Sequence, residues 1–486
     1  MRTKMFWSLP LFMGLGLACG KKSSGNNNPT GGDNSNNPPV VITPKSDVEF
    51  WLTQSDKTVL FKKQTTSLVF AATGNSYANI EVDDTQTYQQ IDGFGYCLTG
   101  GSATLLNSLT SANKDNVLKE LFAFDSTFIG VSYLRISIGA SDLSANTFTY
   151  DDMPSGQTDE PLDHFSINAE KTDLIPILKK ILAINPNIKI LGSPWSPPVW
   201  MKSNNSFKAG SLKPECYAAY AQYFVKYIQA MKAEGIPIDA ITVQNEPLNG
   251  NNNPSLVMQS GEQANFVKNN LGPAFQAAGI NTKIIVWDHN ADVATYPLAI
   301  LADADAKKYV DGSAFHLYSG SITALSQVHD AHPDKNVYFT EQWVGGPGNF
   351  SGDLQWHVQN LIIGATRNWS KNVLEWNLAS DPGYNPHTNG GCTTCQGALT
   401  ISGDAVARNV SYYIIAHASK FVRPGSVRIS SAQTSTLFTV AFKNPDGKKV
   451  LIVLNKGAAQ EVFNIKVGSR IVTTALSSGA VGTYVW

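Results

Sequence analysis

Eight short apolar segments, each followed by a stretch of helix length, constrain the fold of this 486-residue chain more than any other feature. They are rich in β-branched and aromatic residues. They cover residues 90–98, 132–139, 188–195, 240–247, 283–290, 312–320, 337–344 and 372–380. Short strands that alternate with helices form parallel βαβ units, and eight such units are the pattern of a closed barrel. We therefore predict an α/β fold, a (β/α)8 TIM barrel over residues 89–423.

The segment between the third and fourth predicted strands has the pattern expected of a barrel helix. In "CYAAYAQYFVKYIQAMKAEG", residues 216–235, large apolar side chains recur at three- and four-residue spacing before Gly235. They are Tyr220, Tyr223, Phe224, Tyr227, Ile228 and Met231. We interpret this aromatic stripe as core and not as a ligand site.

Both ends of the chain outside the barrel have β character. After about residue 424 the helical period disappears, and two strand-like runs flank the turn sequence Asn444-Pro-Asp-Gly447. Residues 45–88 have the same strand-like composition. We predict that residues 45–88 and 424–486 pair with each other as one side β-sandwich domain.

The first 44 residues have the composition of a targeting segment followed by a linker. Arg2 and Lys4 precede a short apolar run, which predicts a signal peptide over residues 1–18. "GLAC" at Cys19 resembles a bacterial lipoprotein cleavage box, in which the cysteine is acylated. Residues 19–44 are rich in Asn, Gly, Ser and Pro, as in a flexible tether. We expect an exported lipoprotein, periplasmic or at the cell surface, with plain secretion as the alternative.

Four further cysteines bear on the redox compartment. In an exported protein, Cys392 and Cys395 of "GGCTTCQG" could close a small disulfide loop. A structural zinc site would need two more ligands nearby, and the sequence offers no partner pair. We expect the disulfide and no metal, and Cys97 and Cys216 stay unassigned.

The charge balance excludes one class of partner. Charged residues make up 15% of the chain, against roughly 25% in an average soluble protein, and 37 basic residues face 38 acidic ones. No basic patch indicates nucleic-acid binding. Polarity comes largely from Asn, Ser, Thr and Gly, and 10 Trp are present, which suits neutral polar ligands such as sugars.

Polar or aromatic side chains stand at or just beyond the ends of most predicted strands. In a TIM barrel the carboxyl ends of the strands build the active site. Taken singly, each side chain also fits a structural role, such as a buried ion pair or a core tryptophan. Their recurrence predicts a site made from Arg135, Asp142, Trp195, Asn245, Glu246, Asp288, His289, His316, Tyr318, Glu341 and Trp376.

Glu246 and Glu341 form the candidate catalytic pair. Retaining glycosidases use two carboxyl groups about 5–5.5 Å apart, one as nucleophile and one as proton donor. Because Pro247 follows it, Glu246 is expected in an extended conformation. As a proton donor it should have a pKa raised from about 4.3 toward about 6. Glu341 should be ionised, held so by Tyr318 or Arg135.

Several motifs together carry a family resemblance. "QIDGFG", "YLRISIGASD", "GSPWSPPVWMK", "TVQNEP", "HLY", "FTEQ" and "EWNLA" resemble glycoside hydrolase family 30, over about residues 45–486. That family contains glucosylceramidases and endo-β-1,6-glucanases on a (β/α)8 barrel with a side β-sandwich. The resemblance implies Glu246 as acid/base and Glu341 as nucleophile. It implies a sugar-binding set of Arg135, Asp142, Trp195, Asn245, His316, Tyr318 and Trp376. His289 joins this set by its strand-end position alone.

Within the family we expect an endo-β-1,6-glucanase. The loop of residues 380–403, with its cysteine pair, resembles the glucanase branch. A glucosylceramidase would need an apolar surface near the leaving group, whereas "NGNNNPSL" after Glu246 is polar. A xylan-cleaving relative is a third alternative. A non-catalytic glycan-binding lipoprotein is the alternative from another class, and loss of a glutamate would mark it.

The expected partners follow from this interpretation. The substrate is a β-glucan polysaccharide or oligosaccharide, and the reaction needs no cofactor, because two carboxylates and water suffice. We expect no nucleic acid, contact with a membrane only through the lipid at Cys19, and a monomer.

Overall fold

The computed structural model describes residues 45–486. The predicted signal peptide of residues 1–18, the tether of residues 19–44 and the lipidation site Cys19 lie outside the described residues. Within residues 45–486 no helix is both long enough and apolar enough to cross a membrane.

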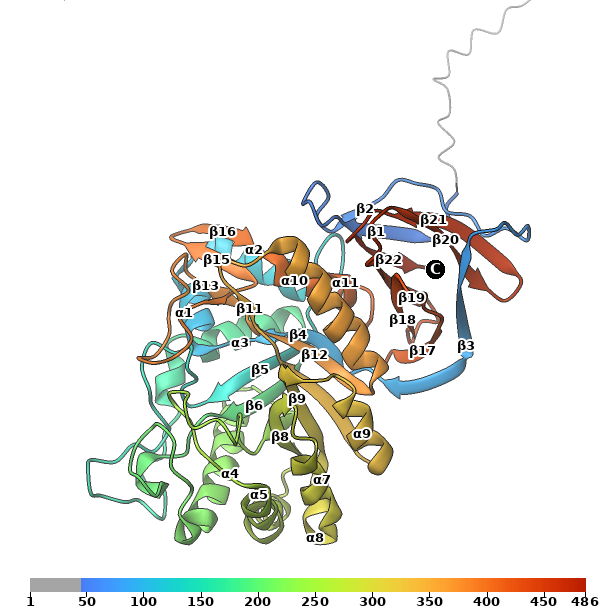
Figure 1. Cartoon of the computed structure of the whole chain (residues 1–486). Coiled ribbons are helices and arrows are strands. Elements are labelled where there is room, and N and C mark those ends of the chain that lie inside the picture. The colour runs from blue at the N-terminus through green and yellow to red at the C-terminus, as the bar shows by residue number, and fades with distance from the viewer. Residues whose placement is uncertain (1–44) are drawn as a thin grey trace, which may run out of the picture. The chain divides into compact units, whose positions relative to one another are not determined.

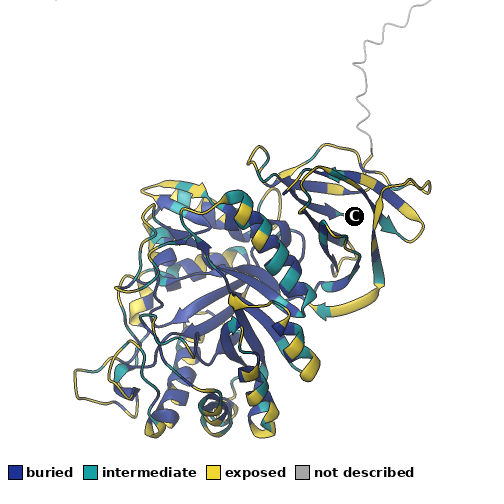
Figure 2. Cartoon of the chain, in the orientation of Figure 1, coloured by how far each residue is buried: buried dark blue, intermediate teal, exposed yellow. Residues whose placement is uncertain are grey.

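Eight parallel strands close into a barrel, as predicted (Figure 1). The order around it is β10-β12-β4-β5-β6-β7-β8-β9. Every strand is mostly buried (Figure 2). The strands are β4 (Gly93–Cys97), β5 (Tyr133–Ile138), β6 (Lys189–Pro194), β7 (Ala240–Thr242), β8 (Lys283–Ala291), β9 (Val310–Gly320), β10 (Asn336–Glu341) and β12 (Ser370–Asn377). Each falls on one of the eight predicted segments, so the predicted fold class is confirmed.

Helices surround the barrel strands (Figure 1). The aromatic stripe is α4 (Tyr217–Ala233), whose large side chains are buried, and Gly235 after it has a φ of 80°. The interpretation of this stripe as core is confirmed. The other helices are α1 (Gly100–Ser108), α2 (Ser111–Phe122), α3 (Leu174–Ile184), α5 (Ser260–Phe266), α6 (Gly272–Ala277), α7 (Thr295–Ala302), α8 (Ala304–Lys307), α9 (Ala324–Ala331), α10 (Phe350–His357) and α11 (Val410–Ser419).

Strands from both ends of the described chain build the side β-sandwich. The hydrogen-bonded order is β2-β1-β22-β19-β18-β17-β3-β20-β21. The strands are β1 (Glu49–Thr53), β2 (Lys62–Lys63), β3 (Ala78–Gln90), β17 (Val427–Ser431), β18 (Leu437–Lys443), β19 (Lys449–Asn455), β20 (Glu461–Val467), β21 (Arg470–Leu476) and β22 (Val481–Val485). The predicted turn at Gly447, with a φ of 86°, joins β18 to β19 as an antiparallel pair.

The long strand β3 joins the two layers of the sandwich. Its first residues pair in parallel with β20, and the rest pairs antiparallel with β17. The inner faces enclose a separate apolar cluster in which the rings of Phe50 and Tyr484 stack at 4.6 Å. β3 ends at Gln90 and barrel strand β4 begins at Gly93, so the sandwich leads directly into the barrel.

Helix α11 connects barrel and sandwich through His417. Its Nε2 lies 2.8 Å from Thr53 Oγ1, and its Nδ1 lies 2.8 Å from Thr483 Oγ1. Burial lowers the pKa of His417 to about 3, so the ring is neutral. One imidazole thereby ties a barrel helix to an early strand and to the last strand of the chain.

The connections after β10 and β12 contain short strands. β11 (Val344–Gly345) pairs with β14 (Cys395–Gln396), and β13 (Ala379–Ser380) pairs with β15 (Leu399–Ser402), which pairs with β16 (Ala405–Arg408). Cys392 and Cys395 are joined by a disulfide, with their Cα atoms 5.7 Å apart. Cys97 and Cys216 are buried free thiols.

Candidate active site

Glu246 leaves β7 in a conformation that the sequence did not predict. β7 ends at Thr242, and Glu246 has a φ of 44°, in the left-handed region. The expectation of extended backbone before Pro247 is wrong. The reason lies in neighbouring strands, because Asn245 N donates to Pro194 O at 2.8 Å and Glu246 N donates to Asp288 O at 3.0 Å. A positive φ at a non-glycine residue costs roughly 1–3 kcal/mol, which the surrounding structure must offset.

A cleft of about 510 Å³ opens over the ends of the barrel strands. Both glutamates and four of the predicted sugar-binding residues line it, namely Asp142, His289, Tyr318 and Trp376. The other four predicted residues are buried and do not line the cleft: Arg135, Trp195, Asn245 and His316.

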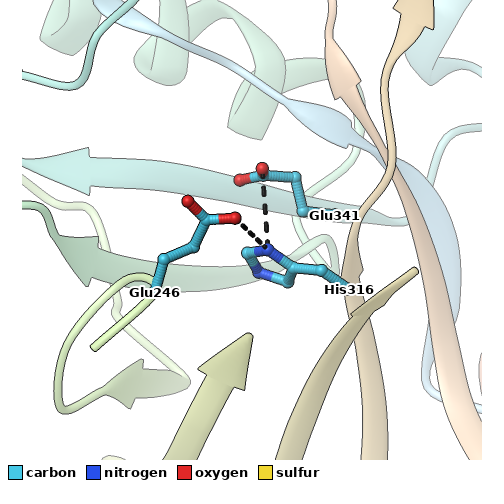
Figure 3. Close-up of side chains that lie close together, drawn as sticks. All are labelled: Glu246, His316 and Glu341. Carbon is cyan, nitrogen blue, oxygen red and sulfur yellow. Dashed lines mark hydrogen bonds and ion pairs between the residues drawn. The ribbon is translucent and has the colours of Figure 1, made fainter. Parts of the chain in front are cut away.

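Glu246 and Glu341 meet at His316. A carboxylate oxygen of each glutamate and a ring nitrogen of His316 all lie within 4.8 Å of one another. Figure 3 shows both carboxylates directed toward the imidazole, from β10 and from the loop after β7. His316 Nδ1 lies 3.2 Å from Glu246 Oε1 and 3.7 Å from Glu341 Oε1. The nearest carboxylate oxygens of the two glutamates therefore lie within 4.8 Å, which agrees with the spacing of about 5–5.5 Å in a retaining pair better than with the roughly 6.5–9.5 Å of an inverting pair.

The same three residues have the separation of a metal-ligand set, and no other such cluster occurs within residues 45–486. Protein donors already engage both carboxylates. Asn249 Nδ2 donates to Glu246 Oε2 at 2.8 Å, and Tyr318 Oη donates to Glu341 Oε1 at 2.9 Å. The arrangement therefore resembles a hydrogen-bonded carboxylate pair more than a set of free ligands.

Arg135 links Glu341 to two other buried side chains by hydrogen bonds. Its Nη1 donates to Glu341 Oε2 at 2.5 Å, and its Nη2 donates to Asp288 Oδ2 at 2.8 Å and to Asn245 Oδ1 at 2.7 Å. The rings of Trp195 and Trp376 stack at 5.3 Å, and the guanidinium carbon lies 4.8 Å from the Trp195 ring centre. Arg135 and Trp195 thus hold other site residues in place.

Asp288 belongs to the predicted strand-end set, but neither the catalytic pair nor the sugar-binding set included it. It is fully buried, and its Oδ1 lies 3.1 Å from His316 Nε2 and accepts a hydrogen bond from Thr340 Oγ1 at 2.6 Å. Its Oδ2 accepts from Arg135 and from Thr242 Oγ1. These donors and the charge of Arg135 outweigh burial and keep the pKa of Asp288 below its usual range. The sequence signal for Asp288 was a carboxylate directly after the apolar residues of β8.

The pKa of Glu246 differs from the sequence expectation, and the neighbouring His316 is the reason. Burial alone would raise the pKa of Glu246, but hydrogen bonding and charge from His316 lower it to about 2. Burial would lower the pKa of His316, but Glu341, Asp288 and Glu246 raise it to about 9. The expected pKa near 6 for Glu246 is therefore wrong. These shifts favour the proton on the His316 imidazole over the adjacent Glu246 carboxylate, and the two groups titrate as one coupled pair.

Two further carboxyl groups have raised pKa values. Burial raises the pKa of Glu341, despite the opposing charges of His316 and Arg135. Burial, with Glu341 and Glu246 nearby, raises the pKa of Asp142 to about 7. Such values mark a crowded anionic site, in which binding and proton transfer are coupled.

Sequence reasoning did not predict several other residues that line the cleft. Asn249 touches Glu246, Trp343 follows the strand of Glu341, and both cysteines of the disulfide line the cleft. Leu248 and Asn252 belong to the same wall. All except Cys395, which is in β14, lie in loops, where no periodic pattern shows which side chains face a cavity.

Two family models match this chain in consecutive segments. The "Glycosyl hydrolase family 30 TIM-barrel domain" matches residues 91–422, and the "Glycosyl hydrolase family 30 beta sandwich domain" matches residues 425–484. The chain belongs to glycosyl hydrolase family 30. Membership of family 30 and the close carboxylate pair make it a retaining O-glycosyl hydrolase.

Family 30 relatives cover most of the chain. The endo-1,6-β-D-glucanase neg1 of Aspergillus fumigatus is 36% identical, covering 77% of this chain and 81% of the relative. The lysosomal acid glucosylceramidase of Mus musculus is 27% identical, covering 82% and 81%. The solved structure of the endo-β1,6-glucanase BT3312 is 36% identical with a TM-score of 0.85, covering 91% of this chain and 99% of that one.

Proposed function

We propose that the protein is an endo-β-1,6-glucanase that works by double displacement. A carboxylate oxygen of Glu246 lies within 4.8 Å of one of Glu341. This distance is the observation that carries the double-displacement mechanism. We assign Glu341 as nucleophile and Glu246 as acid/base. Glu341 ends barrel strand β10, and Arg135 and Tyr318 aim it by hydrogen bonds.

In the first step a Glu341 oxygen attacks the anomeric carbon as the bond to the leaving oxygen breaks. That oxygen takes a proton from Glu246, which shares it with His316. In the second step water attacks the anomeric carbon and gives a proton back to Glu246. Glu341 then leaves as a carboxylate, so charge and protons balance over one turnover.

The cleft offers the contacts that a glucose ring needs. Trp376 contributes an aromatic ring to the lining of the cleft, and Asp142 and Tyr318 offer polar atoms at the same cavity. Asp142 Oδ1 has no hydrogen-bond partner within residues 45–486, which suits a role in accepting a sugar hydroxyl.

The relatives support the β-1,6 linkage. Proteins named as endo-1,6-β-glucanases are 36% identical to the chain, against 27% for the mouse glucosylceramidase. The wall beside Glu246 carries Asn249 and Asn252, and Leu248 is 36% exposed. A largely polar wall favours a sugar over a ceramide tail as leaving group.

The experiment measures sugar release from a β-1,6-glucan, a β-1,3-glucan, a xylan and glucosylceramide. We expect release from the β-1,6-glucan alone or far above the others. Products from a linear β-1,6 oligosaccharide should include fragments longer than one glucose. Release of glucose only, or greater activity on another substrate, would overturn the assignment. The Glu341→Gln variant serves as the inactive control.

We also propose that the protein is exported and anchored through a lipid at Cys19, and that it acts as a monomer. The cleavage-box sequence before Cys19 and the polar residues 20–44 support the anchor. Full-length protein should fractionate with membranes, and Cys19→Ser should move it to the soluble fraction. Sedimentation of residues 45–486 should give the mass of one chain.

A further inference from the structure

The disulfide between Cys392 and Cys395 lies in the wall of the cleft, beside Asp142. The backbone N–H of Cys392 donates to Asp142 Oδ2 at 3.3 Å. Nearby, Thr388 N donates to the backbone oxygen of Asp142 at 2.8 Å. The loop after β12 therefore holds both the main chain and the side chain of Asp142.

The two cysteines differ in how firmly they are held. Cys395 is buried in β14, which pairs with β11 just after the strand of Glu341. Its backbone oxygen accepts from Asn377 Nδ2 at 3.2 Å, and its side chain packs in a cluster with Trp195 and Trp376. Cys392 lies in a loop and is only partly buried. The disulfide thus fixes a loop residue to the short strand β14.

The size of the disulfide loop indicates a local role. Its cysteines are three positions apart, and the loop-closure entropy gained from so short a loop is small. Its removal should therefore have little effect on global unfolding. The group whose position depends on it is the Cys392 N–H, which supplies the hydrogen bond to Asp142 Oδ2.

We propose that the Cys392–Cys395 disulfide positions Asp142 for sugar binding, so that cutting it weakens substrate binding while the barrel stays folded. This rests on the proposed function, because it takes Asp142 as a sugar ligand. Cys392 and Cys395 are then positioning residues. Their oxidation makes the activity depend on an oxidising environment.

Reduction by a dithiol such as dithiothreitol provides one route to the cut form. The S–S bond breaks, two cysteine thiols form, and the reductant becomes its cyclic disulfide, so that two electrons and two protons are transferred. The double variant C392S/C395S provides the second route. Both are compared on an aryl β-glucoside, which reports on the sugar site whichever polymer is the natural substrate.

We expect either route to lower kcat/KM by about ten-fold, mainly through KM, as for the loss of one hydrogen bond to a charged group. Since the Cys392 N–H opposes the raised pKa of Asp142, the pH dependence of KM should move to higher pH in the double variant. Reoxidation of the reduced wild type should restore KM. The reductant should have no further effect on the double variant, and C216S serves as the matched single-cysteine control.

A double-mutant cycle with Asp142→Ala decides whether the effect passes through Asp142. If it does, removing the disulfide in the Asp142→Ala background should change kcat/KM by less than two-fold. An equal ten-fold loss there, or an unchanged KM in the double variant, would overturn the inference. A wild type inactive on every glycoside would instead refute the proposed function. Hydrogen exchange at the Cys392 amide, slow in the oxidised form and fast in the reduced form, tests the positioning without activity.

Discussion

His316 Nδ1 lies 3.2 Å from Glu246 Oε1, and this contact leaves the two groups one proton to share. The other ring nitrogen faces Asp288, which already accepts hydrogen bonds from Arg135, Thr242 and Thr340. Asp288 therefore acts as an acceptor, and Nε2 must carry a hydrogen. The remaining proton lies between Nδ1 and the glutamate that we assign as acid/base.

Replacing His316 should harm proton donation more than sugar binding. We expect His316→Gln to lower kcat/KM about 100-fold for glucosides with poor leaving groups, the usual contribution of general acid catalysis. For 2,4-dinitrophenyl β-glucoside, whose leaving group needs no proton, the loss should be much smaller. Tyr318→Phe is the matched control, since it removes a hydrogen bond to Glu341 and should affect both substrates alike. Equal losses in His316→Gln would contradict the shared proton.

The two glutamates should respond differently to an added nucleophile. Glu341→Gln should lower kcat at least about 1,000-fold with the far-UV circular dichroism unchanged, because the covalent step is lost. In Glu341→Ala, azide should attack from the opposite face and give an α-glucosyl azide. In Glu246→Ala, azide should give a β-glucosyl azide from the covalent intermediate. NMR identifies the anomer of each product. A β-glucosyl azide from Glu341→Ala and an α-glucosyl azide from Glu246→Ala would mean that the two roles are exchanged.

The free energy of unfolding should fall in mildly alkaline solution, because His316 loses its proton there. The pKa of His316 is raised to about 9 from an ordinary value near 6.5, so its stabilising contribution is complete below about pH 6.5. That contribution is lost as the pH rises through about 9. The free energy of unfolding from urea titrations at pH 6 to 9 should fall in the wild type and vary less in His316→Gln. Parallel curves for the two proteins would refute this linkage.

Asp288 had no predicted role in catalysis or sugar binding, but it should matter to stability. Asp288→Asn removes one of two carboxylates that face the buried Arg135, so we expect a loss of about 3 kcal/mol or more. Thr340→Val removes only one neutral donor to Asp288 and should cost about 1 kcal/mol. Urea unfolding of both variants gives the comparison. A smaller loss for Asp288→Asn than for Thr340→Val would contradict the central role of Asp288.

The sequence predicted what depends on periodicity and strand order. The eight segments matched eight strands, because burial of parallel strands imposes long apolar runs. The aromatic stripe of α4 was interpreted correctly because a helix that packs on a core repeats its buried side chains at three- and four-residue spacing. Glu246 and Glu341 were brought together because both follow barrel strands at the same edge.

What the sequence did not predict depends on contacts between distant segments. The φ of 44° at Glu246 follows from hydrogen bonds to Pro194 and Asp288, which no local rule contains. The pKa of Glu246 was expected to be raised, as for a proton donor near another carboxylate, but hydrogen bonding and charge from the adjacent His316 lower it. A pKa is set by the full three-dimensional environment, so residue type and strand position could not give it.

The position of β3 has a consequence for how the chain is made. Val427 of β17 pairs with Gln90, and Phe463 of β20 pairs with Ala78. These partners lie roughly 340 and 385 residues further along the chain, so β3 leaves the ribosome without a sheet to join. During synthesis the pairing of β3 within the sheet must wait until β17 (Val427–Ser431) and β20 (Glu461–Val467) are available. A molecule truncated before residue 427 would lose both partners of β3 and expose an unpaired edge immediately before the first barrel strand.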